Sequence, residues 1–186
     1  AEMREMRAFN LTGRTALITG GGSGIGKGCA KILADAGANV FVIGRRENKL
    51  QEVCEEIRRQ GGICDCYAAD LSREENCEAM VQACVKRFGR LDILINSAGS
   101  RGAHGTLEEE LSAENLRDVM DVDFNSTFWA IKYAYSECQK NGVGPIINIA
   151  SLAALSARGP IVYTAAKGAV RSVSKILAKR FGPLGV

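Results

Sequence analysis

The stretch TGGGSGIG, residues 19–26, decides how the rest of the chain is interpreted. An apolar run over residues 14–19 precedes it, and a helix-forming segment over residues 24–36 follows it. Glycines let a backbone approach a phosphate closely, and the start of a helix presents free N–H groups and a positive dipole end. We therefore predict that this turn binds the phosphates of a nucleotide, through Gly20, Gly22, Ser23, Gly24, Ile25 and Gly26.

Two phosphate-binding motifs compete for this stretch. Residues 21–27 fit G-x-x-x-x-G-K, the start of a P-loop, but the next residue is Gly28 instead of the Ser or Thr that would hold Mg²⁺. Gly20, Gly24 and Gly26 fit the G-x-x-x-G-x-G pattern of a dinucleotide-binding Rossmann turn without a missing part. The sequence favours the Rossmann turn, and an NTPase is the minor alternative.

Short apolar runs alternate with amphipathic segments along the 186 residues. Such alternation produces right-handed crossovers and a parallel sheet that is covered on both faces. We predict a single dinucleotide-binding domain over residues 1–186, with an α/β fold: a three-layer, Rossmann-type doubly wound parallel sheet of strand order 3-2-1-4-5. The predicted strands cover residues 14–19, 39–43, 63–68, 92–95 and 145–149. The predicted helices cover residues 24–36, 47–60, 72–88, 112–140 and 161–181, the third and fourth capped by Ser72 and Ser112.

Composition excludes several classes of protein. The chain has 24 Lys and Arg against 21 Asp and Glu, and a net charge of +3 is too small to indicate nucleic acid or a membrane surface as a partner. No apolar run reaches the roughly 18 residues of a membrane span. The seven cysteines are odd in number and scattered, which is typical of reduced thiols in a cytoplasmic protein. His104 is the only histidine, so we predict no metal site and a solvated loop position for this residue.

The segment after the second predicted strand is where the cofactor's adenosine ribose would lie. A carboxylate there would accept hydrogen bonds from both ribose hydroxyls of NAD. This chain has Gly44 followed by Arg45 and Arg46, and a guanidinium suits bidentate binding of a 2′-phosphate. We predict a preference for NADP(H), with NAD(H) also accepted. A solvated basic loop is the alternative that a basic pair alone does not exclude.

Several further motifs follow the glycine turn in the order in which one protein family has them. With these motifs, the chain resembles the short-chain dehydrogenase/reductase family from about Leu11 to its last residue. It is similar to 3-oxoacyl-carrier-protein reductases and related NADP-dependent carbonyl reductases. The matching motifs are Asp70-Leu71 for the adenine contact, Asn96-Ser97-Ala98-Gly99 for Asn-Asn-Ala-Gly, and Tyr163 to Lys167 for Tyr-x-x-x-Lys. The resemblance implies that Asp70, Leu71, Asn96, Ala98, Gly99, Tyr163 and Lys167 contact the cofactor. It further implies that Asn125, Ser151, Tyr163 and Lys167 are catalytic.

The chemistry of the Tyr-Lys pair can be argued from the residues. Tyr163 and Lys167 are four apart and share one face of a helix. An ammonium and a positive nicotinamide favour the phenolate, so that Tyr163 exchanges a proton with a substrate oxygen that Ser151 polarises. The resemblance adds that Lys167 holds the nicotinamide ribose and that Asn125 continues a proton relay. A Tyr and a Lys at this spacing also fit an ordinary surface pair, and only the motifs together favour catalysis.

Two features depart from the family pattern. Ser151 precedes Tyr163 by 12 residues, one fewer than usual. We expect a shortened loop over residues 152–162, and the alternative is that Ala150 stands in the register of the serine. The family also continues with two more strands, a loop for the nicotinamide amide and a substrate lid, so we expect the chain to be truncated after Val186.

The function predicted from these residues is an oxidoreductase that transfers a hydride between NADP(H) and a small carbonyl or secondary alcohol. The alternative is a cofactor-binding but inactive regulatory or assembly protein of the same fold. We also predict a homodimer or homotetramer formed through the two longest helices. The last helix offers small side chains at Ala165, Ala166, Gly168 and Ala169, and the long helix before it offers Phe128, Trp129, Tyr133 and Tyr135, unless these aromatic residues belong to the core.

Overall fold

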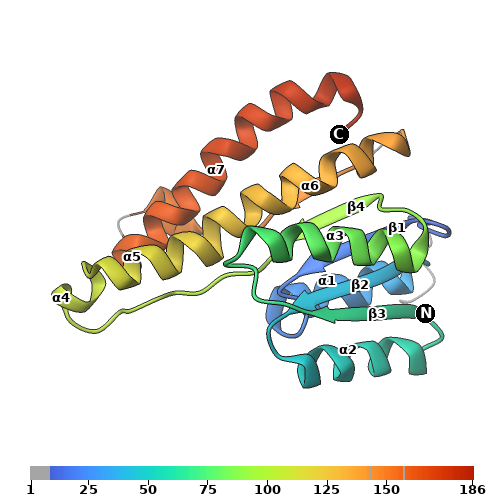
Figure 1. Cartoon of the computed structure of the whole chain (residues 1–186), viewed down its shortest axis with the longest axis horizontal. Coiled ribbons are helices and arrows are strands. Elements are labelled where there is room, and N and C mark those ends of the chain that lie inside the picture. Colours follow the sequence, from blue (N-terminus) through green and yellow to red (C-terminus); the bar gives the residue numbers. More distant parts are fainter. Residues whose placement is uncertain (1–8, 143, 157) are drawn as a thin grey trace.

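Five parallel strands form one sheet in the order β3-β2-β1-β4-β5 in the computed structural model, which describes residues 9–142, 144–156 and 158–186 (Figure 1). Thr19 at the end of β1 is in register with Ile43 of β2 and with Asn96 of β4, so the carboxyl ends of these strands reach one edge. The predicted Rossmann-type topology is confirmed. The strands are β1 (Thr15–Thr19), β2 (Asn39–Gly44), β3 (Ile63–Ala68), β4 (Ile93–Asn96) and β5 (Ile146–Asn148).

Helices cover both faces of the sheet. The helices are α1 (Gly24–Asp35), α2 (Glu47–Arg59), α3 (Glu74–Phe88), α4 (Leu107–Glu110), α5 (Ala113–Met120), α6 (Ser126–Lys140) and α7 (Ile161–Phe181). Ala16 and Ile18 of β1 belong to the core beneath α1 and α2, whereas Leu17 belongs to the core beneath α3 and α6. Successive strand side chains point to opposite faces, so a sheet covered twice needs continuous apolar strands. None of the described helices is long and apolar enough to cross a membrane.

The predicted helix over residues 112–140 is divided by a π-helical turn, η2 (Asp121–Asn125). The predicted helix has an apolar stripe at helical spacing, formed by Leu116, Met120, Phe124, Phe128 and Ile131. The wider turn shifts the face that follows it, so only part of this stripe stays on the core. Leu116 and Phe128 of that stripe are 51% and 44% exposed. The buried positions are Asn115 and Val119 in α5, Asp123 in η2, and Ser126, Thr127, Ala130, Ile131, Ala134 and Cys138 in α6, and of these only Ile131 belongs to the stripe.

The two predicted helix caps have different outcomes. The Ser112 hydroxyl accepts a hydrogen bond from the Asn115 N–H at 3.1 Å, as predicted. The Ser72 cap is wrong, because α3 begins two residues later and Arg73 is its N-cap residue. Asp70 closes the turn before α3 instead, with its carboxylate accepting from the Ser72 N–H and its carbonyl accepting from the Asn76 amide.

The cysteines and the histidine form neither a disulfide nor a metal site among the described residues. All seven cysteines are free thiols, and five of them are buried. His104 is exposed, and its Nδ1 lies 3.0 Å from the Gly102 carbonyl. Within the described ranges, no three His, Cys, Asp or Glu side chains are grouped to hold a metal ion.

Asp92, immediately before β4, ties the amino ends of the central strands together. Its buried carboxylate accepts hydrogen bonds from the Thr15 N–H, from Arg14 and, through two nitrogens, from Arg90. Burial alone would raise the pKa of Asp92, but these hydrogen bonds outweigh it and lower the pKa below the ordinary value. The ionised form of Asp92 therefore stabilises the fold.

We expect this stabilisation to depend on pH. A lowered folded-state pKa contributes stability above the unfolded-state value of about 3.9, and the contribution is lost as the pH falls through the folded-state value. Asp92→Asn should lower the free energy of unfolding by about 1–3 kcal/mol near neutral pH, and the difference from wild type should narrow below about pH 4. Denaturant unfolding at several pH values measures this, with the exposed Asp35→Asn as control. A difference that does not change with pH would contradict the assignment.

Candidate active site

A cavity of about 540 Å³ opens at the carboxyl edge of the sheet, lined by segments that follow each of the five strands. This is the place where open parallel sheets bind ligands, and the volume suits a small organic molecule. Fourteen of the predicted site residues line it together: Gly20, Gly22, Ser23, Gly24, Ile25, Arg45, Arg46, Asp70, Leu71, Ala98, Gly99, Ser151, Tyr163 and Lys167.

Three predicted site residues are not among the cavity-lining residues. A Cβ on Gly26 would overlap the Gly20 carbonyl, so this glycine allows α1 to pack closely on the turn that precedes it. The Asn96 amide donates to Asn148 Oδ1 at 2.8 Å and joins β4 to β5. The Asn125 amide donates to Asp121 Oδ1 at 2.7 Å within η2, so the structure does not bring Asn125 to the cavity.

The glycine turn is held against the loop that follows β4. Gly20 has a φ of +66°, and a Cβ there would lie 2.8 Å from the Ser97 carbonyl oxygen. The Thr19 hydroxyl accepts hydrogen bonds from the N–H groups of Ser97 and Ala98, at 3.0 and 3.1 Å. Ser23 is the N-cap residue of α1, and its side chain makes no capping hydrogen bond. The first N–H groups of α1 are therefore not satisfied by this hydroxyl, as a phosphate site at the helix start requires.

Basic side chains gather where the second strand ends. Arg45 and Arg46 are exposed and line the cavity, and Arg46 Nη2 lies 3.5 Å from the Ser23 hydroxyl. Lys49 also lines the cavity, with its ammonium 2.8 Å from Glu52. Sequence reasoning missed Lys49, although its position one helical turn after Arg45 is a signal that could have identified it. Three basic side chains therefore line this end of the cavity.

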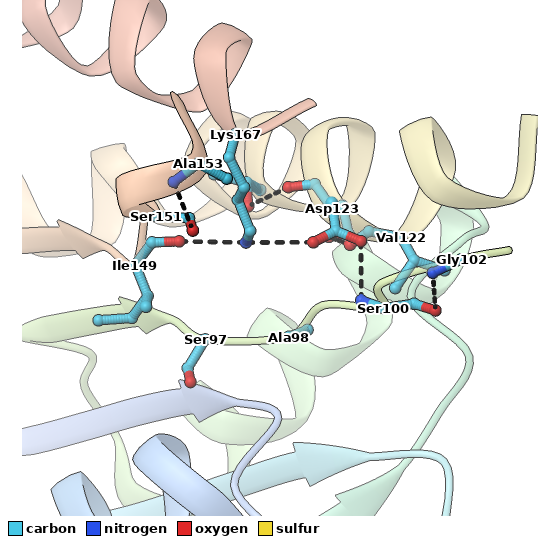
Figure 2. A network of polar contacts seen from close by, with 12 residues as sticks. Ser97, Ala98, Ser100, Gly102, Val122, Asp123, Ile149, Ser151, Ala153 and Lys167 are labelled. Carbon is cyan, nitrogen blue, oxygen red and sulfur yellow. Dashed lines mark hydrogen bonds and ion pairs between the residues drawn. The ribbon is translucent and has the colours of Figure 1, made fainter. Parts of the chain in front are cut away.

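The other end of the cavity holds the predicted catalytic side chains. Lys167 is 5% exposed, and its Nζ donates to the Ile149 carbonyl at 3.1 Å (Figure 2). The same Nζ lies 5.8 Å from the centre of the Tyr163 ring. The Ser151 hydroxyl accepts from the Ala153 N–H at 3.2 Å, which leaves its own proton for an oxygen in the cavity.

A buried carboxylate that the sequence analysis missed completes this end. Asp123 Oδ1 lies 3.2 Å from Lys167 Nζ, and Asp123 Oδ2 accepts from the Ser100 N–H at 2.7 Å. Burial raises the pKa of Asp123, while the Ser100 N–H and the Lys167 charge oppose that rise. The sequence does contain a signal for Asp123, which follows Val119 by four residues and so shares its face of the predicted helix. A charged residue on a core-facing side of a helix is rare unless it is paired.

A parallel sheet with a glycine turn at one end of its cavity and a Tyr-Lys pair at the other defines a nucleotide-dependent oxidoreductase. The family described as short chain dehydrogenase matches residues 14–186. The chain belongs to the short-chain dehydrogenase/reductase family, whose members act on alcohol and carbonyl groups.

Known proteins resemble the chain along nearly all of its length. The 2-dehydro-3-deoxy-D-gluconate 5-dehydrogenase of Bacillus subtilis (strain 168) is 38% identical over 184 residues, which are 96% of this chain and 69% of that protein. The structure of 7α-hydroxysteroid dehydrogenase complexed with NADH and 7-oxo glycochenodeoxycholic acid has a TM-score of 0.89 at 29% identity, covering 97% of this chain and 69% of that one. Actinorhodin polyketide ketoreductase with NADPH has a TM-score of 0.86 at 32% identity, covering 92% and 66%. The chain thus spans about two thirds of the length of these relatives.

Proposed function

We propose that this chain binds a nicotinamide cofactor, with NADP(H) preferred, and exchanges a hydride between it and a small carbonyl or secondary alcohol. The observation that carries the proposal is a single cavity that joins the glycine turn and Arg45 to Ser151, Tyr163 and Lys167. The named relatives act on alcohol and carbonyl compounds, so they do not favour the alternative of an inactive protein. A cytoplasmic location is part of the proposal and is supported by the free thiols.

The residues at the Lys167 end supply the proton chemistry. The Ser151 hydroxyl donates a hydrogen bond to the substrate oxygen and orients it. Tyr163 gives that oxygen a proton in reduction and removes one in oxidation, and the buried ammonium of Lys167 favours the phenolate that oxidation requires. The nicotinamide, when bound, supplies or accepts the hydride.

The residues at the other end of the cavity hold the rest of the cofactor. The start of α1 binds the pyrophosphate, and Asp70 and Leu71 contact the adenine. One structural relative contains NADH and another contains NADPH, so the preference in this chain rests on its own side chains. Arg45 and Arg46 favour a 2′-phosphate by charge-assisted hydrogen bonds, and Lys49 adds a third cation.

Self-association through α6 and α7 is the remaining part of the proposal. Phe128 of α6 and Ile176 of α7 are 44% and 46% exposed, so each of the two helices presents a large apolar side chain that a second copy of the chain could cover. The other aromatic residues on α6 are less available. Trp129 and Tyr133 pack partly against the core, and Tyr135 stacks on Phe181 at 5.1 Å.

Tyr163→Phe removes only the hydroxyl, so we expect the rate to fall by about 10²–10⁴ while cofactor affinity changes little. NADPH consumption with a panel of sugar-acid, cyclic and steroid ketones measures the rate, and cofactor fluorescence measures the affinity. Tyr133→Phe is the matched control, since its hydroxyl bonds to Glu74 away from the cavity. A rate near wild type in Tyr163→Phe would remove this residue from the mechanism.

Arg45→Ala should weaken NADPH binding by about ten- to a hundredfold and leave NADH binding nearly unchanged. A hydrogen bond to a charged phosphate contributes about 1.5–3 kcal/mol, and about 1.4 kcal/mol is a factor of ten in affinity. Titration of both cofactors into wild type, Arg45→Ala and the exposed control Arg59→Ala provides the comparison. Equal losses for both cofactors, or tighter NADH binding by wild type, would show that Arg45 does not contact a 2′-phosphate.

We expect the protein to form a homodimer or homotetramer in solution at micromolar concentration, so its measured mass should be two or four times that of the monomer. Phe128→Asp should shift the protein toward monomer in light scattering, because it places a charge in the proposed contact. Ile32→Asp, on an exposed position of α1 on the opposite face of the sheet, should not. A wild-type protein that is monomeric throughout would end this part of the proposal.

A further inference from the structure

Asp123 is a fully buried carboxylate in the cavity for which the mechanism above has no use. Its side chain is 0% exposed, and the Lys167 side chain that it faces is 6% exposed. Removing a carboxylate and an ammonium from water is costly unless each finds a partner. Figure 2 shows how this cost is offset: Lys167 Nζ lies between the Ile149 carbonyl and the Asp123 carboxylate.

The surroundings of Asp123 match a carboxylate better than its amide. The two groups that face its side chain, Lys167 Nζ and the Ser100 N–H, are both hydrogen-bond donors. A carboxylate has two acceptor oxygens, whereas an asparagine would turn an NH₂ group toward one of these donors. Asp123 Oδ1 accepts no well-aligned hydrogen bond from any described residue, so charge holds it to Lys167.

Glycine at position 99 keeps this pair close to the loop after β4. A Cβ on Gly99 would lie 2.8 Å from Asp123 Oδ1 and 3.4 Å from Lys167 Nζ. The loop therefore lies directly against the carboxylate. Asp123 Oδ2 also fixes the loop at Ser100, whose N–H donates to it. The pair is part of the cavity wall, since Gly99, Asp123 and Lys167 all line it.

Other charges around the pair are at the surface or already matched. From α7 the groups facing Asp123 are Lys167 and Tyr163, and from the loop after β4 Arg101 lines the same cavity. On α5, which packs against η2, Glu114, Arg117 and Asp118 are exposed. On α6 the first charge is Lys132, which pairs with Glu74 of α3. Asp70, Arg45, Arg46 and Lys49 lie around the glycine-turn end of the cavity. Among the described residues, Lys167 is the one cation within ion-pair distance of Asp123.

We propose that Asp123 is a positioning residue that acts through Lys167: its carboxylate fixes the ammonium and offsets part of its charge at Tyr163. The pH at which Tyr163 exchanges its proton is then higher than an uncompensated lysine would set. The proposal rests on the proposed function for its consequence in catalysis, but the charge effect itself exists without substrate or cofactor.

The test compares Asp123→Asn with Asp121→Asn. Both changes remove one negative charge from η2, but Asp121 accepts from Asn125 and does not line the cavity. Ultraviolet absorbance of tyrosinate follows the titration in cofactor-free protein, and subtracting the curve of the matching Tyr163→Phe variant isolates Tyr163. Asp123→Asn should move the midpoint of the Tyr163 titration to lower pH by about one unit, as the loss of a nearby like charge does. Asp121→Asn should leave it within a few tenths of wild type.

No shift in Asp123→Asn, or an equal shift in Asp121→Asn, would overturn the proposal. Thermal unfolding checks that each variant is folded, and Asp123→Ser, smaller and also uncharged, takes the place of Asp123→Asn if that variant does not fold. The pH dependence of turnover, measured on any ketone that wild type reduces, should shift in the same direction. A titration shift without wild-type turnover would support the role of Asp123 and contradict the proposed function. Turnover without a titration shift would support the proposed function and contradict the role of Asp123.

Discussion

The contact between the end of β1 and the loop after β4 is the constraint on which the cavity depends. The strand order reverses at this point, since β2 and β3 lie on one side of β1 while β4 and β5 lie on the other. Thr19 and Gly20 bring the two backbones together, one through a hydroxyl that accepts from two N–H groups and the other by lacking a Cβ. A larger residue at Gly20 would push the loop away and separate the two ends of the cavity. The glycine turn and the cavity wall that carries Ser151, Tyr163 and Lys167 are therefore parts of one local arrangement.

The features that could be predicted from sequence are those that short stretches of chain determine. The apolar strands, the glycine turn and the start of α7 each carry their signal within about ten residues, and the strand order follows from right-handed crossovers. All of these are present as predicted, and α7 begins and ends at the predicted residues. Most of the candidate site could be predicted for the same reason, because its residues follow the strand ends directly. Ser151 and Ala150 both line the cavity just after β5, so the Ser151 register stays a prediction.

The region around η2 could not be predicted, for a reason of packing. A π-helical turn leaves no composition signal, and the aromatic residues at 124 and 128 indicate a core-facing stripe by hydrophobicity alone. In the structure, small residues such as Ala130 and Ala134 face α3 and the sheet, while Phe128 points to the surface. The turn rotates the following helix relative to α5 and places Asp123, instead of Asn125, at the cavity. The resemblance implied a role for Asn125, whereas the residue of η2 that lines the cavity, besides Val122, is Asp123.

The charged side chains at the two ends of the cavity differ in how far they are buried. At the glycine-turn end, Arg45, Arg46 and Lys49 remain accessible to water, so each cation keeps its hydration. At the other end, Lys167 has almost no access to water and needs a fixed anion, which Asp123 provides. Without this anion, the full field of the ammonium would act on the Tyr163 phenol, but the cost of burying the charge would not be offset. Pairing it with Asp123 holds the ammonium in place, at the expense of part of its field at the phenol. The carboxylate thus reduces the electrostatic effect of Lys167 at Tyr163 and in return fixes the position of the lysine.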